Sequence, residues 1–131
     1  MANSETAQLL PILQQVATGL ADPANHYMLQ AHWYEHEGQR VLFAAVYLHH
    51  DCAWNFELGP DAVAVDVLLD RRHLDRRSRI SIPYAEIYGV QHYAGADFGG
   101  TFLDRHTLYF SIEKMASLTP RLKELLKAPQ A

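Results

Sequence analysis

The strongest constraint on this chain is the alternation of apolar residues on either side of Gly59-Pro60-Asp61. Every second residue is apolar on both sides of this segment, and the alternating set comprises Trp54, Phe56, Leu58, Val63, Val65, Val67 and Leu69. A period of two places such residues on one face of a β-strand, and Gly-Pro-Asp turns the chain. The pattern therefore predicts a β-hairpin over residues 54–69, and we expect it at the centre of a sheet with that face buried.

An N-terminal helix is predicted over residues 4–21, where apolar residues recur at intervals of three and four. This apolar stripe comprises Leu9, Leu10, Leu13, Val16, Ala17 and Leu20. Pro11 is tolerated in a first helical turn, so we expect the regular helix to begin near Leu10. Asp22-Pro23 ends the helix, because the residue before a proline is disfavoured in the helical conformation.

Further strands are predicted on both sides of the 54–69 hairpin. They are expected at residues 27–36 and 40–48, joined by a turn at 37–39, and at 80–82 and 107–112. Residues 87–93 form either a strand or a short helical turn, and the glycines at 95, 99 and 100 predict a loop. Thr119-Pro120 is expected to begin a final helix, with Thr119 as its N-cap.

These elements predict an α+β fold in a single domain, residues 1–131. We expect the N-terminal helix to pack on a small, curled, mainly antiparallel sheet of five to seven strands, with a helix at the C-terminus. A chain of this length buries roughly 65–70% of the surface that its unfolded form exposes, which is enough for a hydrophobic core.

The lone cysteine and the lack of a visible targeting segment predict a cytoplasmic, bacterial-type protein. The net charge of -4 is mild, and the single cysteine, Cys52, cannot form an internal disulfide. Residues 1–6 lack the basic-then-apolar order of a signal peptide. The longest apolar run, 41–48, is far shorter than the roughly 20 residues that cross a bilayer, so we expect no membrane partner. Nucleic acid is not an expected partner either, because the chain has no stripe of basic and aromatic residues.

His32-Trp33-Tyr34-Glu35-His36 fits H-x-x-E-H, the inverted zinc motif in which two histidines bind the metal and the glutamate activates water. It resembles the signature of the pitrilysin-type metallopeptidases, whose third ligand is a glutamate far along the chain, a place taken here by Glu113. The motif requires a helix, where residues four apart share a face. Residues 27–36 are predicted to be a strand, in which Glu35 points away from both histidines. We therefore expect no bound metal, and a zinc peptidase is the least favoured of our hypotheses.

His49-His50-Asp51-Cys52 is a second cluster of residues that commonly bind metals. Side chains that are adjacent in sequence point apart, so they rarely bind one ion together. We interpret this cluster as a polar turn between two strands.

Five of the eleven basic residues stand close together, and they are Arg71, Arg72, Arg76, Arg77 and Arg79. The guanidinium group binds carboxylates and phosphates through paired hydrogen bonds. We predict that these arginines bind an acidic group or a terminal carboxylate of a partner. The alternative is a solvated loop, partly neutralised by Asp70 and Asp75.

Four short segments carry a resemblance to a known family. They are Glu37-Gly38-Gln39-Arg40-Val41-Leu42, Phe56 to Val65, Ile80 to Val90 and Gly99-Gly100-Thr101-Phe102. In order and spacing they resemble the stringent starvation protein B (SspB-like) adaptors of the Clp protease, over residues 5–102. The resemblance implies an N-terminal helix on a small Sm-like β fold and a groove that holds degradation-tagged peptides. It also implies delivery of those peptides to an AAA+ unfoldase, usually by a homodimer.

The chain departs from that family in two places. The family has a Gly-Gly turn where this chain has the longer arginine-rich segment. The family also ends in a flexible tail with a basic and apolar docking motif, whereas residues 103–131 are predicted to form a strand and a helix. Residues 123–127, KELLK, have that composition but lie in the predicted helix.

The sequence thus predicts a non-enzymatic domain that binds a peptide or protein without a cofactor, of the adaptor type. The alternative is a dedicated interaction protein, such as a secretion chaperone or an immunity protein, that binds one partner. A free C-terminal tail would favour the adaptor, and a docked C-terminal helix would favour the dedicated binder.

Overall fold

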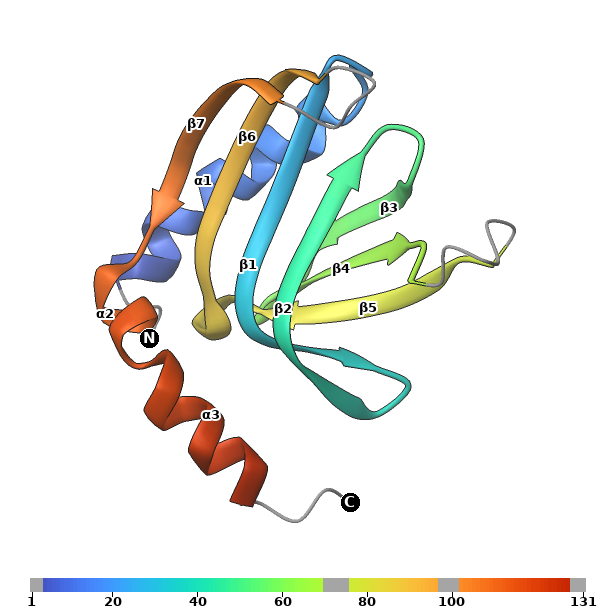
Figure 1. The fold of residues 1–131 in the computed structure, drawn as a ribbon. Coiled ribbons are helices and arrows are strands. Elements are labelled where there is room, and N and C mark those ends of the chain that lie inside the picture. Colours follow the sequence, from blue (N-terminus) through green and yellow to red (C-terminus); the bar gives the residue numbers. More distant parts are fainter. Residues whose placement is uncertain (1–3, 70–75, 97–101, 128–131) are drawn as a thin grey trace.

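The computed structural model describes residues 4–69, 76–96 and 102–127. The elements in chain order are α1 (Ser4–Gly19), β1 (Asn25–His36), β2 (Gln39–His49), β3 (Ala53–Leu58), β4 (Ala62–Val67), β5 (Ser78–Pro83), the 3-10 turn η1 (Tyr84–Glu86), β6 (Ile87–Ala96), β7 (Phe102–Phe110), α2 (Ile112–Ala116) and α3 (Leu118–Lys127). The predicted α+β class is confirmed: an N-terminal helix precedes a mainly antiparallel open sheet, and short helices follow it (Figure 1).

The long strand β1 organises the sheet, because it is paired along both of its edges. On one edge β2 runs antiparallel to it, from His26 opposite His49 to His36 opposite Gln39. The other edge is shared by β6, over residues 25–31, and by β5, through Glu35 opposite Ser81. The path through the sheet is β3-β4-β5-β1-β6-β7, with β2 beside β1.

The turn between β1 and β2 confirms the predicted first hairpin. Glu37 and Gly38 both have positive φ, at 53° and 79°. Two successive residues in this region make the turn whose twist matches that of antiparallel strands, and glycine adopts this conformation at little cost.

The sheet curls around α1, which contacts β3 near one end of the path and β7 at the other (Figure 1). Leu9, Leu13, Val16 and Leu20 of the predicted stripe are buried in this curl. The expectation that the helix begins near Leu10 is wrong, because α1 begins at Ser4 and includes Pro11. Pro11 lies on the exposed side, where water can bond the carbonyl group that proline leaves without a partner.

The hairpin of residues 54–69 forms as β3 and β4, but its predicted central position is wrong. β3 lies at the end of the sheet path, and β1 takes the centre. Val63, Val65 and Val67 are buried, whereas Phe56 and Leu58 are half-buried against the core. Alternation shows only that one face of a strand is buried. It does not distinguish a central strand from an edge strand, because an edge strand of an antiparallel sheet also has one buried face.

Several boundaries after residue 83 differ from those predicted. Residues 87–96 are a strand that includes Gly95, and β7 begins at Phe102 rather than Thr107. The short helix α2 was not predicted; the Ser111 hydroxyl caps it by accepting a hydrogen bond from the Lys114 N–H at 3.2 Å. α3 begins at Leu118 and extends away from the sheet (Figure 1). Among the described residues, no helix is both long and apolar enough to span a bilayer.

Candidate functional site

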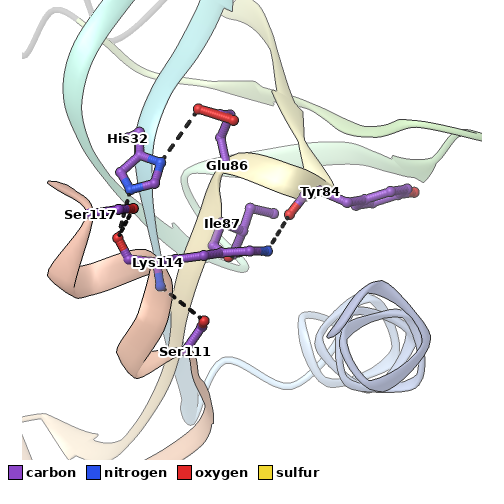
Figure 2. A network of polar contacts seen from close by, with 7 residues as sticks. All are labelled: His32, Tyr84, Glu86, Ile87, Ser111, Lys114 and Ser117. Atoms are coloured by element: carbon purple, nitrogen blue, oxygen red, sulfur yellow. Dashed lines mark hydrogen bonds and ion pairs between the residues drawn. The ribbon is translucent and has the colours of Figure 1, made fainter. Parts of the chain in front are cut away.

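The H-x-x-E-H stretch lies on β1, as predicted, and its first histidine is buried. His32 is 3% exposed, and each of its ring nitrogens lies near one polar group (Figure 2). Its Nε2 lies 3.0 Å from the carbonyl oxygen of Lys114, and its Nδ1 lies 3.4 Å from Oε1 of Glu86. Because a carbonyl oxygen only accepts hydrogen bonds, Nε2 carries a proton and donates it. His32 therefore helps hold the polypeptide after β7 against the sheet.

Lys114 is the centre of this polar network (Figure 2). Its ammonium group donates to the carbonyl oxygens of Tyr84 and Ile87, at 3.3 Å each. Its own carbonyl oxygen accepts a hydrogen bond from the Ser117 hydroxyl at 2.8 Å as well as the bond from His32. These contacts fix α2 on η1 and the start of β6, so we interpret the network as structural.

The other residues of the zinc hypothesis do not join His32. Glu35 and Glu113 are exposed, and His36 lies at the end of β1, next to the turn. Across residues 4–69, 76–96 and 102–127, no three His, Cys, Asp or Glu side chains are grouped so that they could hold a metal ion. The absence of a metal in the protein itself stays a prediction.

The predicted partner-binding arginines are placed only in part, since Arg71 and Arg72 lie outside the described residues. Arg76 is exposed, and the guanidinium group of Arg77 lies over the Trp54 ring, 3.8 Å from its centroid. Arg79 makes ion pairs with Asp66 at 3.0 Å and with Glu57 at 3.2 Å.

Two of these arginines are therefore bound by the protein's own strands. Arg79 also donates to the carbonyl oxygen of Asn55 at 3.2 Å. The hydrogen bonds from Asn55 and Arg79 lower the pKa of Asp66 below its ordinary value. A role of the five arginines in partner binding stays a prediction.

His49 is the last residue of β2, and residues 50–52 form the turn to β3, as interpreted from the sequence. His49 and His50 both bond the connection that follows α1. His49 Nε2 lies 2.7 Å from the carbonyl oxygen of Pro23, and His50 Nδ1 lies 3.2 Å from that of Leu20. Burial raises the pKa of the Cys52 thiol, which keeps it protonated at neutral pH and argues against a reactive cysteine.

A shallow cavity of about 530 Å³ lies between α1, β1 and β6. It is lined by uncharged polar side chains and by Pro11, and the polar set includes Gln14, Gln15, Thr18, Asn25, Tyr27 and His92. The Asn25 amide nitrogen donates to the Gly19 carbonyl oxygen at 3.0 Å, and His92 Nε2 lies 2.9 Å from the amide oxygen. These bonds join the end of α1 to the sheet.

The sheet has three strands that pair on one side in the described chain: β2, β3 and β7. Exposed strand edges recruit other chains unless charges, bulges or coverings protect them. β3 is interrupted at Asn55, whose φ is 53° and whose carbonyl oxygen Arg79 already occupies. β7 contains the charged residues Asp104 and Arg105.

In the part of the chain that the structure describes, β2 has none of these protections between Val41 and Leu48. These eight residues, VLFAAVYL, include no charge, no glycine and no proline. Within the described chain β2 pairs with β1 alone, so the N–H and C=O groups of every second residue face outward from the sheet edge.

The outer face of β2 is apolar too. Val41 and Tyr47 are each 38% exposed and Ala45 is exposed, whereas Val46 and Leu48 are buried in the core. The sequence shows this apolar run, but its edge position depends on pairings that only the fold reveals. The unprotected edge of β2 is thus the strongest candidate for a functional surface.

Comparisons with known proteins assign the chain to no family. No family model matches the chain, and no curated protein matches its sequence.

Proposed function

We propose that this protein is a non-enzymatic domain that binds a segment of another polypeptide by adding it as a strand to the open edge of β2. Strand addition supplies affinity through main-chain hydrogen bonds, and side-chain pockets or patches supply selectivity. The observation that carries the proposal is the contrast among the three edges of the described sheet: β3 and β7 are protected, whereas no described residue protects β2.

The SspB-like resemblance supports the same class of function, in which an adaptor holds a peptide for an AAA+ unfoldase. A cytoplasmic location and a homodimer belong to this proposal. The apolar outer face of β2, with Val41 and Tyr47 exposed, favours partner segments with apolar residues at alternate positions.

The second candidate is a dedicated interaction protein with one partner. The docking of α2 through Lys114 and His32 favours it, because an ordered segment stands where the adaptors have a flexible tail. Both candidates use the edge of β2. They differ in whether many related peptides or one protein bind there.

Selection from a display library of random peptides tests the proposal. The affinity of an enriched peptide is then measured by fluorescence anisotropy for the wild type, Ala45→Lys and Thr107→Lys. Ala45 and Thr107 are both exposed, on β2 and on the edge strand β7 respectively, so neither lysine is buried. Because Thr107→Lys also removes the hydrogen bond from the Thr107 hydroxyl to Gln91 Oε1 at 2.8 Å, a thermal melt of each variant accompanies the titration.

We expect Ala45→Lys to weaken binding at least about tenfold, or about 1.4 kcal/mol, and Thr107→Lys to leave it unchanged. Amide hydrogens of residues 41–48 should exchange more slowly in the complex. Equal affinities for the wild type and Ala45→Lys, or slowed exchange elsewhere and not in β2, would refute strand addition at this edge.

A further inference from the structure

Three aromatic rings stack at the C-terminal end of β2. His26 of β1 stands directly opposite His49 of β2, and their ring centroids are 4.3 Å apart with planes 13° from parallel. The Tyr47 ring stacks on His26 at 5.7 Å, and its hydroxyl is hydrogen-bonded to His26 Nδ1. This ring cluster, His26, Tyr47 and His49, takes two of its three members from the proposed binding strand.

The hydrogen bonds of His49 specify its neutral form. The Pro23 carbonyl oxygen can only accept, so His49 Nε2 carries a proton and donates it over 2.7 Å. The N–H of Asp51 donates to His49 Nδ1 at 3.2 Å, so Nδ1 must be without a proton. A proton on Nδ1 would face the Asp51 N–H and remove this bond.

Several titratable groups surround the ring cluster. From β6, Tyr93 stands opposite His26, and His92 acts on it electrostatically. The turn after β2 contributes Asp51, whose carboxylate lies 3.8 Å from His49 Nδ1, and Cys52, which acts electrostatically on Tyr47 together with Asp51. Burial, followed by the two neighbouring histidines, lowers the pKa of His26, which agrees with a cluster built for neutral rings.

We propose that the stacked pair of His26 and His49 makes strand addition at β2 dependent on pH. At neutral pH the uncharged rings stack, and His49 ties the end of β2 to Pro23. On acidification a proton on His49 breaks its bond from the Asp51 N–H, and charge on both rings opposes their stacking. Because Tyr47 and His49 belong to β2, the end of the binding edge loosens and its partner is released. This inference rests on the proposed function.

The test measures the affinity of one selected peptide, free of ionisable side chains, at pH 7.5 and pH 5.5. The variant His49→Gln keeps a donor for the Pro23 carbonyl without taking up a proton, and His26→Phe keeps a stacked ring without charge. His106→Gln, at an exposed position on β7, is the matched control: the His106 ring stacks on His92, 6.1 Å away, which is a neighbour of the cluster and not a member of it.

We expect the wild type and His106→Gln to lose at least about tenfold in affinity at pH 5.5. The two cluster variants should lose less than about twofold. A wild-type affinity that does not change with pH would overturn the inference, and so would cluster variants that weaken as much as the wild type.

If no peptide binds at either pH, the proposed function fails. The pH dependence of the ring cluster is then tested in the free protein. Amide exchange of residues 45–49 is then compared between wild type and His49→Gln after correction for the intrinsic effect of pH. Loss of protection at pH 5.5 in the wild type alone would support the proton-dependent contact, and equal protection in both proteins would overturn it.

Discussion

The hydroxyl group of Tyr27 lies where a side chain at Gly19 would have to stand. Gly19 is the last residue of α1, and its carbonyl oxygen also accepts the hydrogen bond from Asn25. A methyl group there would displace the buried ring of Tyr27, which packs in the core.

We therefore expect Gly19→Ala to lower the free energy of unfolding by about 1–3 kcal/mol, the usual cost of overpacking. Helix propensity alone would change stability in the opposite direction, since alanine is favoured over glycine by about 1 kcal/mol. Urea denaturation of the wild type and Gly19→Ala decides the sign, with Thr18→Ala as an exposed neighbouring control. A stabilised Gly19→Ala would show that Tyr27 can move without cost.

The Lys114 network predicts that removing the ammonium group of Lys114 lowers the free energy of unfolding. Lys114→Met keeps the aliphatic chain but leaves the carbonyl groups of Tyr84 and Ile87 without this donor. We expect a loss of about 1–3 kcal/mol in unfolding free energy. Lys123→Met, at an exposed position on α3, should change stability by less than about 0.5 kcal/mol. Equal effects of the two substitutions would mean that the network does not hold α2.

Arg79 should contribute to stability and not only to partner binding. Its ion pairs with Asp66 and Glu57 are partly exposed, so we expect Arg79→Ala to cost about 0.2–1 kcal/mol at neutral pH. Because the folded-state pKa of Asp66 is lowered, its stabilising effect is full above its ordinary value of 3.8 and is lost as pH falls through the folded value.

The difference between wild type and Arg79→Ala should therefore shrink as pH falls below 3.8. Chemical denaturation at several pH values measures it, and a difference that stays constant to the lowest pH would exclude the Asp66 contact as its source.

We expect protein purified without a histidine tag to contain no stoichiometric zinc. His32 is buried with its ring nitrogens directed to Lys114 and Glu86, and on a strand Glu35 points away from it. Elemental analysis measures the metal content. One zinc per chain that disappears in His36→Ala would contradict this prediction and revive the peptidase hypothesis.

The sequence predicts most of the helices and strands, because the spacing of apolar residues and the turn residues between them determine these elements locally. The alternation of Val63, Val65 and Val67 records one buried face, and it gives the correct hairpin. The position of that hairpin in the sheet depends on which strands pair with β1. The pattern of residues within each strand does not determine this pairing. β7 shows the same limit. The sequence predicts its apolar second half as a strand, whereas its more polar first half is a strand because it pairs with β6.

The candidate site was less accessible to prediction than the fold. Charge alone singled out Arg79, and the structure places its guanidinium group on Asp66 and Glu57. The run from Val41 to Leu48 reads as an ordinary core strand until its pairing on one side is known. His49 and His50 were recognised as a polar turn, but their bonds to Pro23 and Leu20 cross about thirty residues of sequence.

The central position of β1 has a consequence for the nascent chain. β2 follows β1 at once, but the partner on the other edge arrives late: Leu29 pairs with Val90, about sixty residues further on. At a synthesis rate of about 5–20 residues per second, that edge of β1 waits about 3–12 s for β6. During this interval the first hairpin offers two unpaired edges to other chains in its surroundings. The arrival of β6 and β5 closes one of them, whereas no later strand of the described chain pairs with the edge of β2.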